Sequence, residues 1–255
     1  MSVNIPIDYA WIEATGLAAV RFTAFLFIAP PFAYNAFPAR IKAMLAVGLA
    51  IVVSSRVTPG YESLGTGEFF LALTMNVLIG ALLGFLVMLC FTAIQAAGNL
   101  IDLSGGFQMS SAYDPNLGQQ SSPFGRLFQM TALLILFVSD GYQLVLSGFV
   151  RSFDALPVTG SINLAGPVTL LIDATSQMLV SAVQIAGPIM IVLFLADAGL
   201  GLMTRVAPAL NAFAMGFPLK ILLTLTLAGS IILALPRIVG AIAEDMGGLL
   251  IGGAQ

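Results

Sequence analysis

The chain has 255 residues, of which 59% are hydrophobic and only 8% charged, whereas soluble domains carry about 25% charged residues. Its formal net charge of −3 includes no basic block, which excludes nucleic-acid binding as a function. One cysteine and no histidine exclude disulfides within the chain, Cys-cluster zinc sites, His-ligated metals or haem, and His-dependent nucleophilic triads. We therefore expect an all-α integral membrane protein without a cofactor.

Apolar segments that predict membrane helices begin near the N-terminus. The first spans residues 11–34 and contains a proline pair that ends the helix. The second, residues 43–54, is shorter than the roughly 20 residues that cross a bilayer. The third, residues 69–97, is longer than one crossing requires, and its Gly80 and Gly84 form a GxxxG that lets another helix approach closely.

The C-terminal half continues the pattern of long apolar segments. Residues 124–153 contain a central Ser-Asp-Gly break, which predicts a bent or two-part helix. In the next segment, residues 167–203, Gly187-Pro188 predicts a kink. Turn-rich residues 204–219 predict a loop before the last apolar run, 220–235, and the weakly amphipathic tail that follows could form an interfacial helix.

A single long polar stretch, residues 98–122, interrupts the apolar segments. It contains Asp102, a Ser-Gly-Gly, an Asp-Pro and a run of amides and hydroxyls, all of which favour turns over helices. Lipid cannot satisfy the backbone of such a stretch, so it must be buried in protein or line a wet cavity. The stretch therefore predicts a pore or a gate.

Three charged residues interrupt the apolar segments at Arg21, Asp140 and Asp197. A charge at that depth costs roughly 3 kcal/mol on insertion scales and usually faces a bundle interior or a partner. We expect these three side chains to serve structural pairing.

Four sequence blocks, in order over some 200 residues, resemble the FliR/SctT-like family of type III secretion export-gate proteins, and within it the flagellar branch. The blocks are Arg21 with residues 29–31 and 37–46, residues 98–115, residues 140–153, and residues 196–223. The chain departs from the family at Tyr142, where a histidine is common, and at Asp197, where an asparagine is common.

The resemblance implies a transport component of the bacterial inner membrane and flagellar basal body, not an enzyme. It implies long, kinked helical hairpins packed in a larger helical assembly with FliP and FliQ subunits, with FlhB around its base and membrane lipids nearby. Unfolded flagellar subunits would pass through this assembly. We expect one domain, residues 1–255, made of N-terminal helices at 1–97, a plug-like loop at 98–122 and C-terminal hairpins at 123–255.

The resemblance also assigns the plug to the polar stretch. Such a plug needs pliant backbone, adaptable apolar side chains and amides that bind no single sequence. The expected plug residues are Gly105, Gly106, Phe107, Met109, Tyr113, Asp114, Pro115, Asn116, Gly118 and Gln119.

Three alternatives remain. The chain could be the injectisome homologue of the gate subunit. It could be a small-molecule or ion transporter, with a charge relay of Arg21, Asp140, Asp173 and Asp197. An intramembrane aspartyl protease, suggested by Tyr113-Asp114, is disfavoured because the chain lacks the second signature, GxGD.

Overall fold

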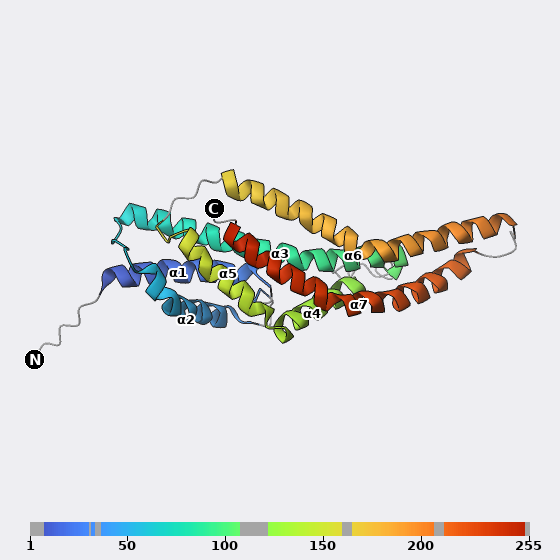
Figure 1. The fold of residues 1–255 in the computed structure, drawn as a ribbon, viewed down its shortest axis with the longest axis horizontal. Helices are drawn as coiled ribbons and strands as arrows, with labels where there is room; N and C mark the ends of the chain where they lie inside the picture. The colour runs from blue at the N-terminus through green and yellow to red at the C-terminus, as the bar shows by residue number, and fades with distance from the viewer. Residues whose placement is uncertain are drawn as a thin grey trace, which may run out of the picture. The chain divides into compact units, whose positions relative to one another are not determined.

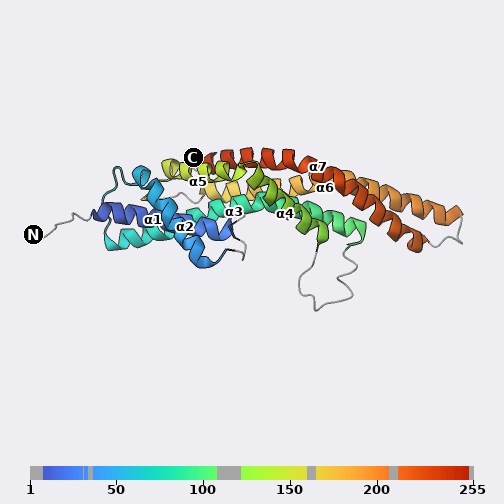
Figure 2. The same ribbon diagram turned by 90° about the horizontal axis from the view of Figure 1, so that it is seen from below.

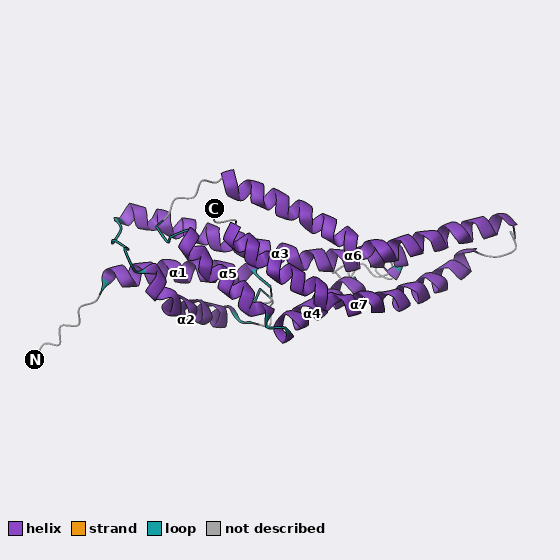
Figure 3. Cartoon of the chain, in the orientation of Figure 1, coloured by secondary structure: helices purple, strands orange, loops and turns teal. Residues whose placement is uncertain are grey.

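The computed structural model describes residues 8–30, 32–33, 37–107, 122–159, 165–206 and 212–252. Within these ranges the regular structure is entirely α-helical (Figure 1, Figure 3). The helices are α1 (Tyr9–Ile28), α2 (Ala39–Val57), α3 (Thr66–Gly105), α4 (Pro123–Val138), α5 (Gly141–Ala155), α6 (Ala165–Val206) and α7 (Ala212–Gly252).

Four of these helices, α1, α3, α6 and α7, contain stretches long and apolar enough to cross a membrane, and α4 with α5 would add a fifth if the broken pair counts as one span. The expected all-α membrane fold is therefore confirmed. The second apolar segment forms α2, with 19 residues, and is not among these candidate spans. In contrast, α3, α6 and α7 have 40 or more residues each, about 60 Å at 1.5 Å per residue, twice the hydrocarbon thickness.

Two predicted loop boundaries were wrong. Residues 98–105 are not a turn but the last part of α3, because Ile101 and Asp102 are buried and continue the packed face of the helix. Similarly, α7 begins at Ala212 and runs through Pro218 and Pro236, so residues 212–219 are helical. Proline is tolerated in membrane helices, where neighbouring groups can satisfy the freed carbonyl. The tail after Pro236 is helical, as the end of α7, whereas its position at a membrane interface stays a prediction.

The predicted break in the fourth apolar segment is confirmed. α4 ends at Val138 and α5 begins at Gly141. Between them Asp140 adopts a left-handed φ of 56°, a conformation that aspartate tolerates better than most residues.

The chain divides into two compact units, and the first comprises residues 1–88, 141–173 and 243–255. In it α1 packs against α2, and an aromatic cluster joins α1 to α5. The ring centroids of Phe22 and Phe25 of α1 lie 4.7 and 4.3 Å from the ring centroid of Phe149.

The predicted close approach at the GxxxG of α3 is confirmed as a contact with α1. A Cβ added at Gly80 would lie 2.2 Å from the carbonyl oxygen of Arg21, and a Cβ added at Gly84 would lie 3.0 Å from the carbonyl oxygen of Phe25.

The second unit comprises residues 89–140 and 174–242. It contains the C-terminal part of α3, then α4, and the antiparallel pair formed by α6 and α7 (Figure 2). A Cβ added at Gly216 would lie 3.2 Å from Leu200 Cδ1, so α6 and α7 approach closely near their connection.

Candidate functional site

The expected plug is bounded by the end of α3 and the start of α4, which the structure describes in detail. The two helices meet through glycines: a Cβ added at Gly98 would lie 2.5 Å from the Cα and N atoms of Gly125. One turn away, Gln129 Nε2 donates a hydrogen bond to Gln95 Oε1 at 3.1 Å. α3 and α4 therefore form a tightly packed antiparallel pair.

A buried carboxylate joins the ends of these helices. Asp102 of α3 is fully buried, and its Oδ2 accepts hydrogen bonds from the hydroxyl of Ser122 and from the backbone N–H groups of Phe124, at 3.0 Å, and Gly125, at 3.3 Å. Ser122 also caps α4, because its Oγ accepts from the Gly125 N–H at 3.1 Å. The first turn of a helix exposes unpaired N–H groups with a partial positive charge, so an anion is stabilised there. We call Asp102, Ser122, Phe124 and Gly125 the α3–α4 clasp.

The two glycines expected to make the plug pliant have a more defined role. Gly105 is the last residue of α3, and a Cβ there would lie 2.7 Å from Thr224 Oγ1 of α7. Gly106 has a φ of +82°, the left-handed conformation that ends many helices, and its Cβ position lies 3.2 Å from Phe217 of α7. These residues therefore let α7 pack against the end of α3.

Phe107 follows directly and packs on α4. Its ring lies edge-on to that of Phe124, with centroids 5.2 Å apart, and Phe124 in turn contacts Phe128 at 5.9 Å. The other expected plug residues, Met109, Tyr113, Asp114, Pro115, Asn116, Gly118 and Gln119, lie outside the described residues, so their role stays a prediction.

Of the three charges expected to serve structural pairing, Arg21 lies deepest. It is fully buried in the first unit and its partners are neutral. Nε donates to Asn76 Oδ1 at 2.8 Å, and Nη1 and Nη2 donate to the carbonyls of Leu156 at 2.8 Å and Pro157 at 3.5 Å. The guanidinium also lies 4.3 Å from the ring centroid of Phe153. Asn76 Nδ2 completes the arrangement by donating to Val158 O at 2.8 Å. Arg21 and Asn76 thus fasten the segment after α5 to α1 and α3.

The two aspartates differ from Arg21. Asp197 of α6 forms an ion pair with Lys220 of α7 at 2.7 Å, and its side chain is 50% exposed. Asp140 is exposed at the α4–α5 break and belongs to no ion pair among the residues that the structure describes. Asp173, the fourth member of the alternative charge relay, is exposed on α6. Arg21 and Asp197 are therefore each occupied by local partners.

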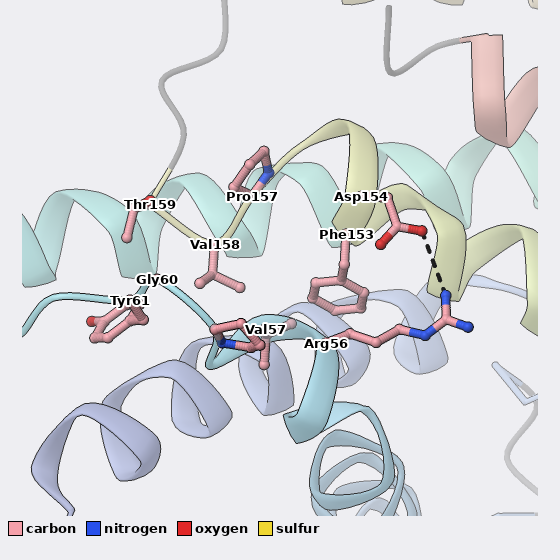
Figure 4. A pocket seen from close by; sticks show the side chains of 10 residues that line it. Arg56, Val57, Gly60, Tyr61, Phe153, Asp154, Pro157, Val158 and Thr159 are labelled. Carbon is pink, nitrogen blue, oxygen red and sulfur yellow. Dashed lines mark hydrogen bonds and ion pairs between the residues drawn. The ribbon is translucent and has the colours of Figure 1, made fainter.

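A pocket of about 270 Å³ lies in the first unit between the loop after α2 and the segment after α5 (Figure 4). Arg56 and Asp154 form an ion pair across it at 3.5 Å, but both side chains are more than half exposed, so the pair contributes roughly 0–1 kcal/mol.

Tyr61 at the edge of this pocket donates a hydrogen bond to Glu13 Oε2 at 3.2 Å. Burial and the Glu13 carboxylate raise the pKa of Tyr61 to about 12, so the phenol stays a donor until strongly alkaline pH and the bond is lost as pH rises through that value.

The ranges that the structure covers hold no cluster of three or more His, Cys, Asp or Glu side chains that could bind a metal ion. The described polar groups instead join helices to one another.

Several of the residues that build these sites were not singled out from the sequence: Asn76, Ser122, Phe124, Gly125, Lys220 and Thr224. The sequence alone indicates a role for one of them, Ser122. Ser122-Pro123 is a helix start, because serine favours the N-cap and proline the first helical position. The partners of Gly98 and Asp102 could not be found this way, since they depend on how α3 and α4 pack.

Substitution of Gly98 by alanine is expected to lower the stability of the protein by about 2 kcal/mol, because the added methyl group meets backbone atoms of Gly125 that cannot rotate away. The check is the temperature at which the detergent-purified protein loses its monodisperse elution peak. Gly187→Ala in α6 is the matched control, since a Cβ there has nothing within 4 Å. Equal melting behaviour of the two variants would contradict the packing described.

The fold and site define a class: an all-α multi-pass membrane protein in which a polar sequence segment connects two tightly packed helices, α3 and α4. Within that class, the chain belongs to the family described as Bacterial export proteins, family 1, which it matches over residues 12–246.

Individual relatives extend the likeness. The chain is 31% identical over 209 residues to the flagellar biosynthetic protein FliR of Bacillus subtilis, covering 80% of each chain. It is 28% identical over 241 residues to FliR of Escherichia coli, covering 93% of this chain and 89% of the relative. It is also 33% identical over 162 residues to the Yop proteins translocation protein T of Yersinia pestis, covering 63% of this chain and 62% of the relative.

Proposed function

We propose that this chain is a subunit of the type III protein export gate in the flagellar basal body of a bacterial inner membrane. Family membership and the names of the relatives support a protein-export role. The flagellar assignment rests on the greater coverage of the two flagellar biosynthetic proteins, 80% and 93% of this chain, against 63% for the Yop translocation protein. An injectisome gate is the alternative within the same class.

The observation that carries the proposal is the pair of helix ends, those of α3 and α4, to which the polar stretch is connected. Residues 108–121 leave from the end of a 40-residue apolar helix and return into the first turn of α4, where a buried carboxylate holds both ends. A polar segment at such a place needs an aqueous or protein-lined surrounding, which a channel provides. We infer that this segment is the plug of the channel.

The exposed face of the α6–α7 pair supports an assembly with partner subunits. Only 22% of the spanning window of either helix is buried, against 56% for α3. Exposed apolar side chains on these helices are equally compatible with contact to lipid and with contact to partner proteins. However, the half-exposed Asp197 and its partner Lys220 lie on the same helices, and charges in hydrocarbon cost roughly 3 kcal/mol each. Partner helices of the FliP and FliQ type would cover this face, with FlhB at the base and unfolded flagellar subunits as cargo.

Deletion of residues 106–118 tests the plug. The expected outcome is a complex that still assembles, judged by co-purification of the partner subunits, but that leaks small ions across the membrane of intact cells. The physical reason is that the deletion removes the obstruction and leaves α3 and α4 intact. A same-length Gly-Ser replacement separates the loss of chain length from the loss of side chains. An assembled complex that remains ion-tight after the deletion would refute the proposed role.

A further inference from the structure

The exposed side of α2 carries a row of apolar residues with an arginine at each end. Met44, Gly48 and Val52 lie at intervals of four residues and therefore on one side of the helix. Met44 is 75% and Val52 76% exposed, and a Cβ added at Gly48 would have nothing within 4 Å. Arg40 precedes this row and Arg56 follows it at the same spacing, and α2 contains no acidic residue. We call Met44, Gly48 and Val52 the α2 row.

The α2 row ends at the pocket between the loop after α2 and the segment after α5, because Arg56 lines that pocket (Figure 4). The Arg56 guanidinium reaches Asp154 of α5 with one nitrogen, at 3.5 Å, and its other N–H groups have no acceptor among the described residues. The pocket volume of about 270 Å³ is below the roughly 300–1,000 Å³ of pockets that enclose a drug-sized molecule. The pocket therefore fits a small polar group that still finds free donors.

A buried cation lies behind the wall of this pocket. Arg21 is fully buried, and its guanidinium lies 4.3 Å from the ring centroid of Phe153, which lines the pocket. The hydrogen-bond acceptors of Arg21 are an amide and two carbonyls, so no anion among the described residues neutralises its charge. A positive charge in a poorly screened interior attracts an anion placed in the adjoining pocket.

The exposed charges around the pocket point the same way. Arg56 and Asp154 balance each other, and the exposed Arg151 lies three residues before Asp154, hence beside it on the surface of α5. Neither Glu13 nor Glu62 lines the pocket, and Glu13 already accepts hydrogen bonds from a hydroxyl and a backbone N–H of the loop after α2. Together with the buried guanidinium, these charges favour a negatively charged ligand.

We propose that the pocket holds the phosphate-bearing headgroup of an anionic phospholipid and that an acyl chain of this lipid lies on the α2 row. A free phosphate would leave the α2 row uncovered, and an apolar partner helix would leave the cations without an anion, whereas a phospholipid supplies both parts. The proposal concerns the first unit alone and does not depend on the export role.

The dimensions of the α2 row agree with a lipid chain. Met44 precedes Arg56 by 12 residues, which is about 18 Å along a helix at 1.5 Å per residue. One leaflet provides about 15 Å of hydrocarbon, half of the roughly 30 Å of a bilayer. An acyl chain that begins at a headgroup beside Arg56 would therefore reach about as far as Met44.

Binding of phosphatidylglycerol to the whole chain in detergent, titrated and measured by native mass spectrometry, tests the headgroup site. Arg56→Met is expected to weaken the tightest binding event about tenfold, the factor that one lost charge-assisted hydrogen bond gives. Phosphatidylcholine with the same acyl chains should bind about fivefold more weakly than phosphatidylglycerol, because it carries no net charge to meet the excess of cations. Melting of each lipid-free variant shows whether it is folded.

Asp154→Asn provides a test in the opposite direction. It removes the carboxylate that competes for Arg56, so phosphatidylglycerol should bind roughly threefold more tightly than to the natural protein. A substitution that only damaged the fold would not tighten binding. Unchanged or weaker binding by a folded Asp154→Asn protein, or unchanged binding by Arg56→Met, would overturn the headgroup site.

The acyl-chain part is tested with Val52→Glu, which places a carboxylate on the α2 row and should weaken phosphatidylglycerol binding about tenfold. Val138→Glu is the matched control, because Val138 is 79% exposed on α4, outside the first unit, and its substitution should leave this binding unchanged. Equal effects of the two substitutions would overturn the acyl-chain placement.

Two further measurements exclude other occupants. Inorganic phosphate at the same molar concentration should not displace the lipid, and displacement would mean that the pocket takes a free anion. In cells with the complete complex, a photoreactive amino acid at Val52 should crosslink to phospholipid, detected as a mass shift of the chain. A crosslink to a protein in its place would show that a partner covers the α2 row and would overturn the proposal.

Discussion

Substitution of Gly80 by alanine is expected to separate α1 from α3 and to lower the stability of the protein by about 3 kcal/mol. The added Cβ would lie 2.2 Å from the carbonyl oxygen of Arg21 and 3.0 Å from the Cβ of Ala24, and the first of these atoms is backbone. Real Cβ atoms do not approach so closely, so one helix must move. The measurement is the midpoint of thermal loss of the folded species in detergent, together with the yield of the complex.

Alanine substitutions at two other glycines provide comparisons for the Gly80 result. Gly48→Ala in α2 adds a methyl group with nothing within 4 Å and should melt at or slightly above the temperature of the natural protein, because alanine favours the helix. Gly84→Ala meets the Phe25 carbonyl at 3.0 Å and should have an intermediate effect. If Gly80→Ala melted together with Gly48→Ala, α1 and α3 could not pack as described.

Replacement of Arg21 by methionine is expected to cost about 3 kcal/mol or more. Methionine can fill the apolar part of the site, but the buried Asn76 Oδ1 then loses its donor, at about 1–3 kcal/mol, and the partly buried hydrogen bonds to the Leu156 and Pro157 carbonyls are lost as well. Thermal melting and co-purification of the partner subunits measure the loss. Arg21→Lys should recover only part of it, since an ammonium group cannot reproduce the planar guanidinium fork.

Arg56→Met is the control for charge removal. Arg56 is exposed and its ion pair with Asp154 is 3.5 Å long, so its loss should change the stability by less than about 1 kcal/mol. If the Arg21 and Arg56 variants behaved alike, the buried network around Arg21 would not be holding the first unit together.

Composition and hydrophobic patterning were sufficient to predict the helical membrane fold, the break at Asp140 and the close approach of a helix to Gly80 and Gly84. These features depend on local chemistry: apolar run length, a turn-forming tripeptide and the small size of glycine. Helix ends were less predictable. Turn-forming residues in 98–105 and 212–219 were overridden by tertiary packing, because Gly105 and Gly216 each admit a neighbouring helix.

The candidate site was predictable only in outline. The polar stretch and Asp102 stand out in the sequence, but the partners of Asp102 are backbone groups, which carry no side-chain signature. The same is true of Arg21, whose expected pairing turned out to be with an asparagine and two carbonyls and not with either aspartate. Such partners are known only once the helices are placed against one another.

The most direct measurement of the central claim is photo-crosslinking from Phe107, an expected plug residue and the last one described before residue 108. A photoreactive amino acid at this position, in the complete export complex, should crosslink to an export substrate stalled in transit. The same amino acid at Val52, which is 76% exposed on α2, should not. Crosslinks from Val52 and none from Phe107 would mean that the polar segment lies away from the path of the exported chain.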